Sequence, residues 1–532
     1  MPEKICVFTC KNTLFWIKLG VPAFGIYLYW MFVRRKRNKS GVVSIQVIDK
    51  SLGRYEVVRT IGSSSDEPTI EKLFGEGESW VRKQHGLEFD FDKTDDLFEH
   101  FIDGIKQVNI VGHELLLGKI FNDIGFNRIK DELFKKLVLA RLCYPGSKLK
   151  TTDHLRRYEG YETDEDKIYR YLDKLHHTQK RAVQQISYEH TLKILDNKIN
   201  IVFYDVTTLY FEIEQEDKLR KTGYSKDGKH HCPQIVLGLL VSTDGYPLAY
   251  EIYEGNKFEG DTMLPVVNLF KRKYKLQNLV IVADAGLLSN KNMEALQQNR
   301  CQYILGARIK NESNAVKNKI LSLKLKNGES DIIQKDEQNK IVVSYSDSRA
   351  RKDDYNRQRG ILKLEKLIST KRLTKTQINN KGYNKFLKMT GEVEVVLDQT
   401  KIDQDKKWDG LKGYLTNTAL GKDDIIKNYG HLWRIEKAFR VAKTDIKIRP
   451  IYHQLPHRIE AHICIAFVAY KIYKELERQL KELKTELSPE KAIEIAKTIY
   501  CITAQKPKSN EILSRVLLLN EEQQALAKLF NF

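Results

Sequence analysis

The chain has 532 residues, of which 41% are hydrophobic and 30% are charged. This length exceeds that of a usual single domain and the apolar content can fill packed cores, which excludes a disordered or collagen-like protein. Lysine and arginine number 90 against 70 aspartates and glutamates, a formal net charge of +20 that favours nucleic acid or an anionic membrane surface as partner. The seven cysteines include no CxxC pair, so a disulfide framework is disfavoured and a cytoplasmic protein is expected.

Residues 1–30 form an apolar N-terminal extension. The stretch 13–33 is apolar apart from Lys18 and is followed by four basic residues, the pattern of a membrane span with a positive flank. Pro22 and the basic residues of the extension weaken that interpretation. We favour a translated upstream region with Met31 as the start codon, and keep a membrane anchor or a buried helix as alternatives.

The next two regions differ in the period of their apolar residues. Residues 31–69 are expected to form a small β-hairpin region, because β-rich runs at 42–49 and 55–61 flank a turn at 51–53. Between 70 and 197 apolar residues recur three and four positions apart, which predicts an α-helical domain. Lysines and arginines on its polar faces would suit DNA binding, although solvated helix faces have the same composition.

Residues 198–309 carry the signals of a sheet. A β-branched and aromatic run at 201–211 is followed by apolar runs at 234–241 and 246–253, and an Asp-Gly turn separates the last two. Helical and strand patterns then alternate up to residue 307. An antiparallel meander followed by alternating helix and strand is the ribonuclease-H-like layout.

The remainder of the chain divides into three parts. Residues 310–400 are highly charged and are predicted to be an insertion, and the core resumes over 401–455. Residues 456–532 are predicted to be a C-terminal helical region. The fold class that follows is α/β: a ribonuclease-H-like mixed sheet core interrupted by the insertion, with an N-terminal mostly α-helical domain and a C-terminal helical region.

Three acidic residues stand where apolar segments would not otherwise place a carboxylate. Asp205 interrupts the run at 201–211, Asp284 ends a short apolar strand, and Glu436 lies on a helix predicted at 429–443. Because an uncompensated buried charge is costly, we expect the three to converge on cations, and an all-oxygen set suits Mg²⁺ or Mn²⁺. Two such ions, about 3.5–4 Å apart, serve phosphodiester hydrolysis and strand transfer.

The predicted helix carries further functional candidates. Tyr429, Glu436 and Lys443 are spaced by seven, which keeps them on one helix face with a drift of about 20° per step. Lys443 suits a phosphate group as a point charge. Arg440 lies one turn from Glu436 and could pair with that acid or reach the DNA backbone.

These residues and their order resemble the DDE insertion-sequence transposases that carry a Tyr-Arg-Glu-Lys signature. Tyr429, Glu436 and Lys443 occupy the Tyr, Glu and Lys positions of that signature at the family's spacing. Leu432 stands where the family has arginine, and Arg434 is the nearest basic substitute. The resemblance covers most of the chain beyond the N-terminal extension.

The resemblance implies a DNA transposase that cleaves DNA and transfers strands at the ends of an insertion sequence. Asp205, Asp284 and Glu436 would be the catalytic residues and the ligands of Mg²⁺ or Mn²⁺. Four residues would contact DNA: Tyr429, Arg434, Arg440 and Lys443. The implied partners are the double-stranded DNA of the element ends and of the target, with a homodimer in the DNA complex. The implied location is the nucleoid in the cytoplasm. The resemblance also implies that residues 310–400 form a β-rich insertion.

Other functions remain open on the residues alone. A metal-dependent nuclease or resolvase on the same fold would use the same acids, and a non-catalytic, membrane-tethered DNA-binding protein would explain the charge and residues 13–33. A phosphatase of the haloacid-dehalogenase kind is disfavoured, because Thr207 replaces its second Asp and an antiparallel strand follows.

Overall fold

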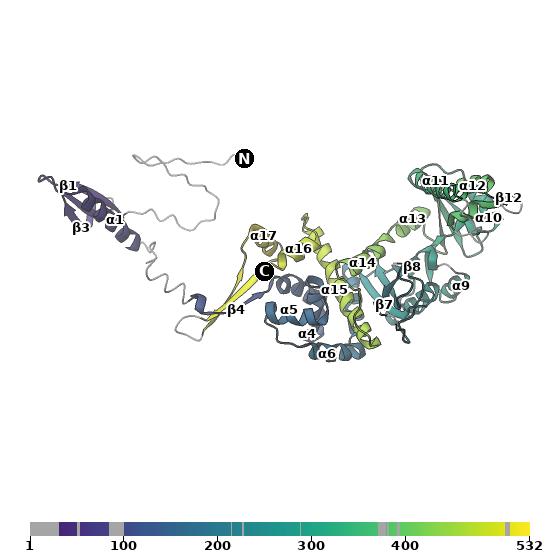
Figure 1. Cartoon of the computed structure of the whole chain (residues 1–532), viewed down its shortest axis with the longest axis horizontal. Coiled ribbons are helices and arrows are strands. Elements are labelled where there is room, and N and C mark those ends of the chain that lie inside the picture. Colours follow the sequence, from purple (N-terminus) through teal and green to yellow (C-terminus); the bar gives the residue numbers. More distant parts are fainter. Residues whose placement is uncertain are drawn as a thin grey trace. The chain divides into compact units, whose positions relative to one another are not determined.

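The protein is described from a computed structural model, shown in Figure 1. The described residues are 31–50, 54–84, 101–213, 215–225, 228–287, 289–370, 379, 382–390, 394–505 and 511–532. They belong to two compact units, of which the first includes residues 31–105 and 504–513 and the second includes 106–503 and 514–532. Of the candidate membrane span, residues 13–30 lie outside the described part. No helix within the described residues is long and apolar enough to cross a bilayer.

The first unit contains an antiparallel sheet in the order β1-β2-β3 and the helix α1. The elements are β1 (Met31–Arg37), β2 (Val43–Asp49), β3 (Glu56–Ser64) and α1 (Glu67–Gln84). The sequence predicted only the β2–β3 pair, because the basic residues of β1 hide its strand pattern. Arg35 of β1 pairs with Glu71 of α1 at 2.6 Å and lies over the Phe74 ring, so the helix compensates this charge.

The second unit includes a run of short helices between residues 119 and 194. They are α3 (Lys119–Ile124), α4 (Glu132–Cys143), α5 (Lys148–Glu159), α6 (Glu165–Thr178) and α7 (Lys180–Ile194). Asp131, Ser147 and Asp164 precede α4, α5 and α6, and each side chain accepts a hydrogen bond from a first-turn backbone N–H. These caps fix where the three helices begin.

The main sheet of the second unit has the order β10-β11-β14-β9-β8-β5-β6-β7. Its strands are β5 (Ile201–Tyr210), β6 (Gln234–Ser242), β7 (Pro247–Glu254), β8 (Val280–Ala283), β9 (Gln302–Ala307), β10 (Ser330–Gln334), β11 (Lys340–Tyr345) and β14 (Leu411–Thr416). Strands β5, β8 and β9 are parallel, and the other pairings are antiparallel. The sheet is therefore mixed, which agrees with the α/β class.

Alternating residues of β5 belong to different hydrophobic cores. Phe203 and Leu209 pack in the core that includes α4, α14 (Trp433–Thr444) and α15 (Pro456–Glu482). Val202 and Tyr204 pack in the core that includes α8 (Met263–Tyr274) and α9 (Asn290–Gln298). Both faces of the sheet are thus covered, which accounts for the nearly continuous apolar run in the sequence.

The predicted insertion at 310–400 is mixed rather than β-rich. Strands β10 and β11 extend the main sheet beyond β14, and the rest includes α10 (Asn314–Ser322), α11 (Asp347–Ser369), the β12–β13 pair (Leu387–Thr390 and Glu394–Leu397) and the start of α12 (Gln399–Lys406). The charged side chains that suggested an insertion form ion pairs within this segment and with its neighbours. Arg357 of α11 is 3% exposed and binds Asp354 and Asp409.

The C-terminal region contains strands as well as the predicted helices. After α15 come α16 (Pro489–Ala496), β15 (Tyr500–Gln505), β16 (Ile512–Leu517) and α17 (Glu521–Phe530). Strands β15 and β16 join β4 (Ile105–Ile110) in a sheet of order β16-β15-β4. The strand β4 lies in the segment 70–197, which was predicted to be mostly α-helical.

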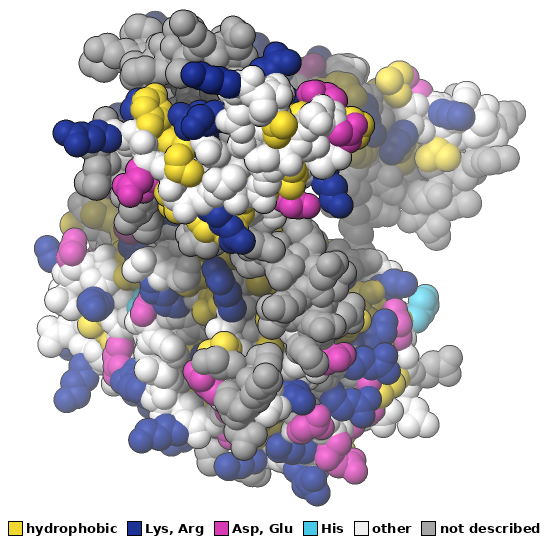
Figure 2. Space-filling view, turned by 90° about the vertical axis from the view of Figure 1, so that its left-hand side faces the viewer, with side chains coloured by type: hydrophobic (Ala, Val, Ile, Leu, Met, Phe, Trp, Pro, Cys, Tyr) yellow, Lys and Arg dark blue, Asp and Glu magenta, His cyan; other side chains and the backbone are white. Residues whose placement is uncertain are grey.

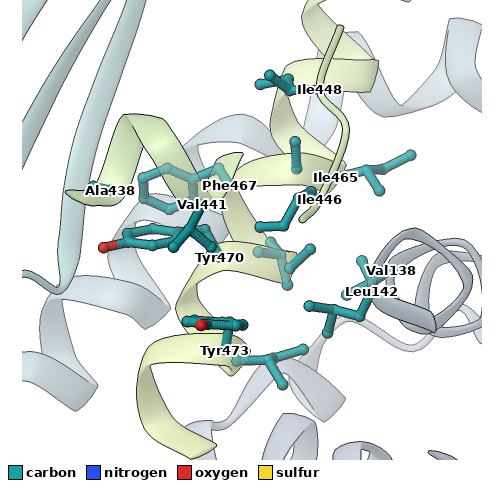
Figure 3. Packing of buried hydrophobic residues seen from close by; sticks show 14 of the residues in the cluster. Val138, Leu142, Ala438, Val441, Ile446, Ile448, Ile465, Phe467, Tyr470 and Tyr473 are labelled. Atoms are coloured by element: carbon teal, nitrogen blue, oxygen red, sulfur yellow. The ribbon is translucent and has the colours of Figure 1, made fainter. Parts of the chain in front are cut away.

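Helix α15 packs against the buried face of α14. Ala438 and Val441 of α14 approach Phe467 and Tyr470 of α15, and α4 contributes side chains from another direction, including Leu142 (Figure 3). The buried face of α14 leaves Glu436 and Arg440 exposed on the opposite side of the helix. Packing therefore fixes which side chains α14 presents outward.

Candidate active site

Strand register places Asp205 and Asp284 side by side. Strands β5 and β8 are parallel, with Tyr204 opposite Ala283, so each aspartate is one residue beyond a paired position. Asp284 follows the carboxyl end of β8, the usual edge for site residues in a sheet with parallel strands. Asp205 is partly buried, and Asp284 is exposed.

The two aspartates also share a sheet face with α14. Side chains two residues apart on a strand point to the same face, so Asp205 lies on the side of Phe203. By the same rule Asp284, just beyond the strand end, continues the side of Val282. Phe203 and Val282 pack in the same core as Ile435 of α14. The helix with Glu436 therefore covers the face toward which both aspartates are directed.

Tyr429 connects Asp284 to the helical part of the site. It lies near the end of α13 (Lys422–Gly430), and its hydroxyl donates to Oδ1 of Asp284 at 3.3 Å. Oδ1 also accepts from the backbone N–H of Ala285 at 2.7 Å. Burial, together with the negative charge of Asp284, raises the pKa of Tyr429, so the phenol remains a donor. The contact holds one oxygen of Asp284 in place.

Gly306 makes room for this contact. A Cβ at this position of β9 would lie 2.5 Å from the Tyr429 hydroxyl and 3.0 Å from the backbone nitrogen of Ala285. Both distances are shorter than ordinary van der Waals contact, so a larger residue would displace the tyrosine or the turn after Asp284. The requirement at Gly306 follows from close approach and not from its backbone conformation.

Glu436 and Asp284 share two neighbours, Lys412 and Tyr429. The Lys412 ammonium lies 4.6 Å from the centroid of the Tyr429 ring. Burial and the charge of Arg349 lower the pKa of Lys412, while the carboxylates of Asp284 and Glu436 act in the opposite direction. Both acids are therefore close enough to influence the same ammonium group. Glu436 itself is exposed, and its carboxylate forms no hydrogen bond or ion pair with any described residue.

The three acids fit a divalent cation in their chemistry, and strand register places two of them side by side. They offer only carboxylate oxygens, which are the ligands that Mg²⁺ and Mn²⁺ prefer. Among the described residues, no three acidic, histidine or cysteine side chains lie close enough to form a ready ligand group. The expectation of three buried acids is corrected, because Asp284 and Glu436 are exposed and Asp205 is only partly buried. Exposed side chains can rotate toward a shared ion without unpacking the core.

The helix predicted at 429–443 is interrupted. Helix α13 ends at Gly430 and α14 begins at Trp433, and the turn between them is closed by bonds that span three residues, such as Leu432 N to Tyr429 O at 3.0 Å. Tyr429 and Glu436 therefore lie on separate helices instead of one face. Only Glu436 and Lys443 keep the predicted spacing on a single helix.

The remaining candidates for DNA contact differ in their surroundings. Arg434 forms an ion pair with Asp244 at 3.2 Å, in the turn between β6 and β7. Arg440 is exposed, and its guanidinium has no hydrogen bond or ion pair to the described residues. Lys443 is partly exposed on the last turn of α14. No sequence pattern indicated Lys412 or Gly306, because their roles depend on strands and helices that meet only in the fold.

The chain matches a family model and several solved structures. The family model described as "Transposase DDE domain" matches residues 196–472, just over half of the chain. A solved structure of the piggyBac transposase synaptic complex with hairpin DNA is 10% identical, with a TM-score of 0.35, and the match covers 73% of this chain and 78% of that one.

A Mos1 transposase paired-end complex with the left transposon end is also 10% identical, with a TM-score of 0.15 and coverage of 33% and 58%. A Mos1 mariner paired-end complex with Mn is 12% identical, with a TM-score of 0.14 and coverage of 30% and 54%. No curated protein matches the chain. On the family match, the chain belongs to the transposase DDE domain family and is a DDE-type DNA transposase.

Proposed function

We propose that the protein cleaves and joins DNA at the ends of an insertion sequence, with Asp205, Asp284 and Glu436 as its catalytic residues and the ligands of Mg²⁺ or Mn²⁺. The observation that carries the proposal is the register of β5 and β8, which sets Asp205 beside Asp284 on the face covered by α14. Glu436 and Asp284 share the neighbours Lys412 and Tyr429, which supports their belonging to one site.

The core is proposed to be ribonuclease-H-like. Its support is the strand order β7-β6-β5-β8-β9, in which three successive antiparallel strands are followed by two that run parallel to the first. This is the order expected from an antiparallel meander followed by alternating helix and strand. Strands β14, β11 and β10 then continue the same sheet.

The residues of the site have separable roles. Divalent ions, when bound, would supply charge stabilisation at the attacking and leaving oxygens of the phosphodiester. The Tyr429 hydroxyl orients the Asp284 carboxylate by its hydrogen bond. Lys412 places a positive charge beside the acids, which lowers their mutual repulsion. Arg440 and Lys443 extend from α14 and would bind backbone phosphates of the DNA.

The proposed partners are the double-stranded DNA of the element ends and of the target. The resemblance to insertion-sequence transposases supports two copies of the chain in the DNA complex and a place in the nucleoid. Tyr429 would have two roles: it would orient Asp284, and it would orient the DNA end. Arg434 would join the DNA contacts only after leaving its ion pair with Asp244.

Substitution of the acids by isosteric amides tests the assignment. Asp205→Asn, Asp284→Asn and Glu436→Gln should each lower cleavage of a duplex bearing the sequences that flank the gene by at least about 100-fold, because several kcal/mol of charge stabilisation is lost. DNA affinity, measured by fluorescence anisotropy, should remain close to that of the wild type because it depends on basic residues.

Glu494→Gln is the matched control. Glu494 lies on α16 and pairs with Lys497 at 2.8 Å, and its loss should leave cleavage unchanged. Normal cleavage by the three site variants would refute the assignment. If the wild-type protein cleaves the end DNA but does not join it to a target duplex, the protein is a nuclease or resolvase instead.

A further inference from the structure

A second charged site lies outside the acidic site, in the second unit. A cavity of about 460 Å³ is enclosed by α4, the start of α5, α6, α15 and the segment that follows α14. The charged residues in its wall are Arg141, Lys148, Lys150, Glu165, Lys447 and Arg449. Five cations therefore face one carboxylate in a cavity large enough for a phosphate group.

Two of these cations are buried without a compensating acid. Lys148 is 6% exposed, and its ammonium forms no hydrogen bond or ion pair with any described residue. Arg141 is also 6% exposed and reaches only the carbonyl oxygens of Lys447 and Gly146, at 3.5 and 3.4 Å. Burial lowers the pKa of Lys148 to about 7 and that of Arg141 to about 10. Such burial is costly unless an anion binds there.

The histidines of the cavity wall do not supply the missing negative charge. His453 and His462 are buried, and burial together with the charges of Lys148 and Arg141 lowers both of their pKa values, that of His453 to about 3. They are therefore neutral at physiological pH. The wall carries a clear excess of positive charge.

The start of α5 adds backbone donors to the cavity. Ser147 caps this twelve-residue helix, and its Oγ accepts from the backbone N–H of Lys150 at 3.3 Å. The first N–H groups of a helix have no partner within the helix, and together they form a partial positive charge that favours phosphate. Because Lys148 is the first residue of the helix, its unpartnered ammonium and these donors line the same cavity.

We propose that this cavity binds a backbone phosphate of the DNA, with Lys148 and Arg141 as its buried anchors. The inference rests on the proposed function in taking DNA as the source of the phosphate. Lys150 and Lys447 are exposed in the same wall and would attract the neighbouring phosphates of a continuous strand. A single small anion held by Lys148 and Arg141 would not need Lys150 and Lys447, so these two exposed lysines favour a longer, polyanionic ligand.

The cavity lies beside the end of the strand that carries Asp205. Arg449 in the wall lies 5.6 Å from the centroid of the Tyr210 ring, at the end of β5. Asp205 is five residues earlier on that strand, roughly 17 Å at about 3.3 Å per residue. That length corresponds to roughly five base pairs at about 3.4 Å per step. The strand end beside the cavity is therefore within the span of a short duplex from Asp205, while the odd spacing directs the Asp205 and Tyr210 side chains to opposite faces of β5.

Lys148→Met tests the proposal in the full-length protein. DNA affinity should fall at least about tenfold, the loss expected for one charged contact, and the slope of log affinity against log salt should fall by about one. Cleavage at saturating DNA should be retained. Without DNA the variant should melt at a higher temperature, because a buried charge without a partner has been removed.

Lys471→Met is the matched control. Lys471 is also fully buried, but its ammonium donates to the backbone oxygen of Ser187 at 3.1 Å and to Oγ1 of Thr191. Its replacement should lower the melting temperature and leave DNA affinity unchanged. The opposite signs of the two temperature shifts would separate a ligand-binding lysine from a structural one.

Inorganic phosphate distinguishes the sources of the anion. It should raise the melting temperature of the wild type but not of Lys148→Met, and it should compete with DNA. Protection by phosphate combined with unchanged DNA affinity in Lys148→Met would overturn the proposal, as would a variant that melts lower and binds DNA normally. The acid variants lose cleavage and keep binding, so failure of either proposal is recognised separately.

Discussion

At the scale of single residues, the site depends on how charge is balanced around Asp284. Its Oδ1 accepts hydrogen bonds from Ala285 and Tyr429, and Lys412 lies against the tyrosine ring. The phenol keeps its proton because burial and the nearby carboxylate raise its pKa. Tyr429 is thus assigned two roles: it positions an acid of the site, and it is proposed to contact the DNA end.

Tyr429→Phe isolates the positioning role. The ring can keep its contact with Tyr414, whose centroid lies 4.9 Å away, while the hydrogen bond to Asp284 is lost. We expect the cleavage rate to fall roughly tenfold, the loss of one hydrogen bond to a charged group, and the Mg²⁺ concentration for half-maximal rate to rise.

Tyr414→Phe is the matched control for this substitution. The Tyr414 hydroxyl accepts a hydrogen bond from Ser344 at 3.4 Å, so its removal should leave cleavage and the Mg²⁺ requirement unchanged. Equal effects of the two substitutions would show that the hydroxyl of Tyr429 has no special role.

The sequence was sufficient to single out Asp205, Asp284 and Glu436, because each departs from a clear strand or helix pattern. It could not indicate Lys412 or Gly306. Gly306 is required because Tyr429, which is 123 positions later in the chain, approaches its backbone. Such a requirement arises from tertiary contacts and leaves no local pattern.

At the scale of elements, α14 carries Glu436, the acid of the proposed site that the sheet does not provide. Ile435 and Ala438 are fully buried against the core shared with α15, whereas Glu436 between them is exposed. The short turn after Gly430 separates this helix from α13. The position of Glu436 therefore depends on packing of α14 and not on a continuous helix from Tyr429.

Ile435→Ala tests this dependence. Removal of a fully buried side chain should lower the free energy of unfolding by about 2–5 kcal/mol, measured with urea. Cleavage should fall as well, because Glu436 is its neighbour and would lose its fixed position. Trp433→Ala is the control in the same helix, since Trp433 is 53% exposed and its loss should change the free energy of unfolding little. Equal destabilisation by both would contradict the assigned buried face.

Several elements depend on partners that are distant in the sequence. The basic strand β1 was not predicted, because Arg35 forms its ion pair with Glu71, which lies 36 positions later in the chain. The strands β10 and β11 were assigned to an insertion, yet they extend the main sheet. For β1 a charged side chain is compensated by a partner distant in sequence. The place of β10 and β11 depends on pairing with β14, which a local pattern does not show.

At the scale of the whole molecule, the formal charge of +20 does not by itself locate the DNA. Figure 2 shows lysine and arginine side chains spread over the face that it presents, with acidic side chains among them. Many cations of the described residues are paired, as Arg434 is with Asp244. Cations without an acidic partner, such as Arg440 beside the site and Lys148 in the cavity, are therefore the more informative candidates.

The most direct test of the central claim is an anomalous difference map of the protein crystallised with cleaved end DNA and Mn²⁺. The three acids are proposed to share ions, so we predict two manganese peaks about 3.5–4 Å apart. Asp205 should contact both peaks, and Asp284 and Glu436 should each contact one. Manganese bound without Glu436, or bound away from the two aspartates, would contradict the account.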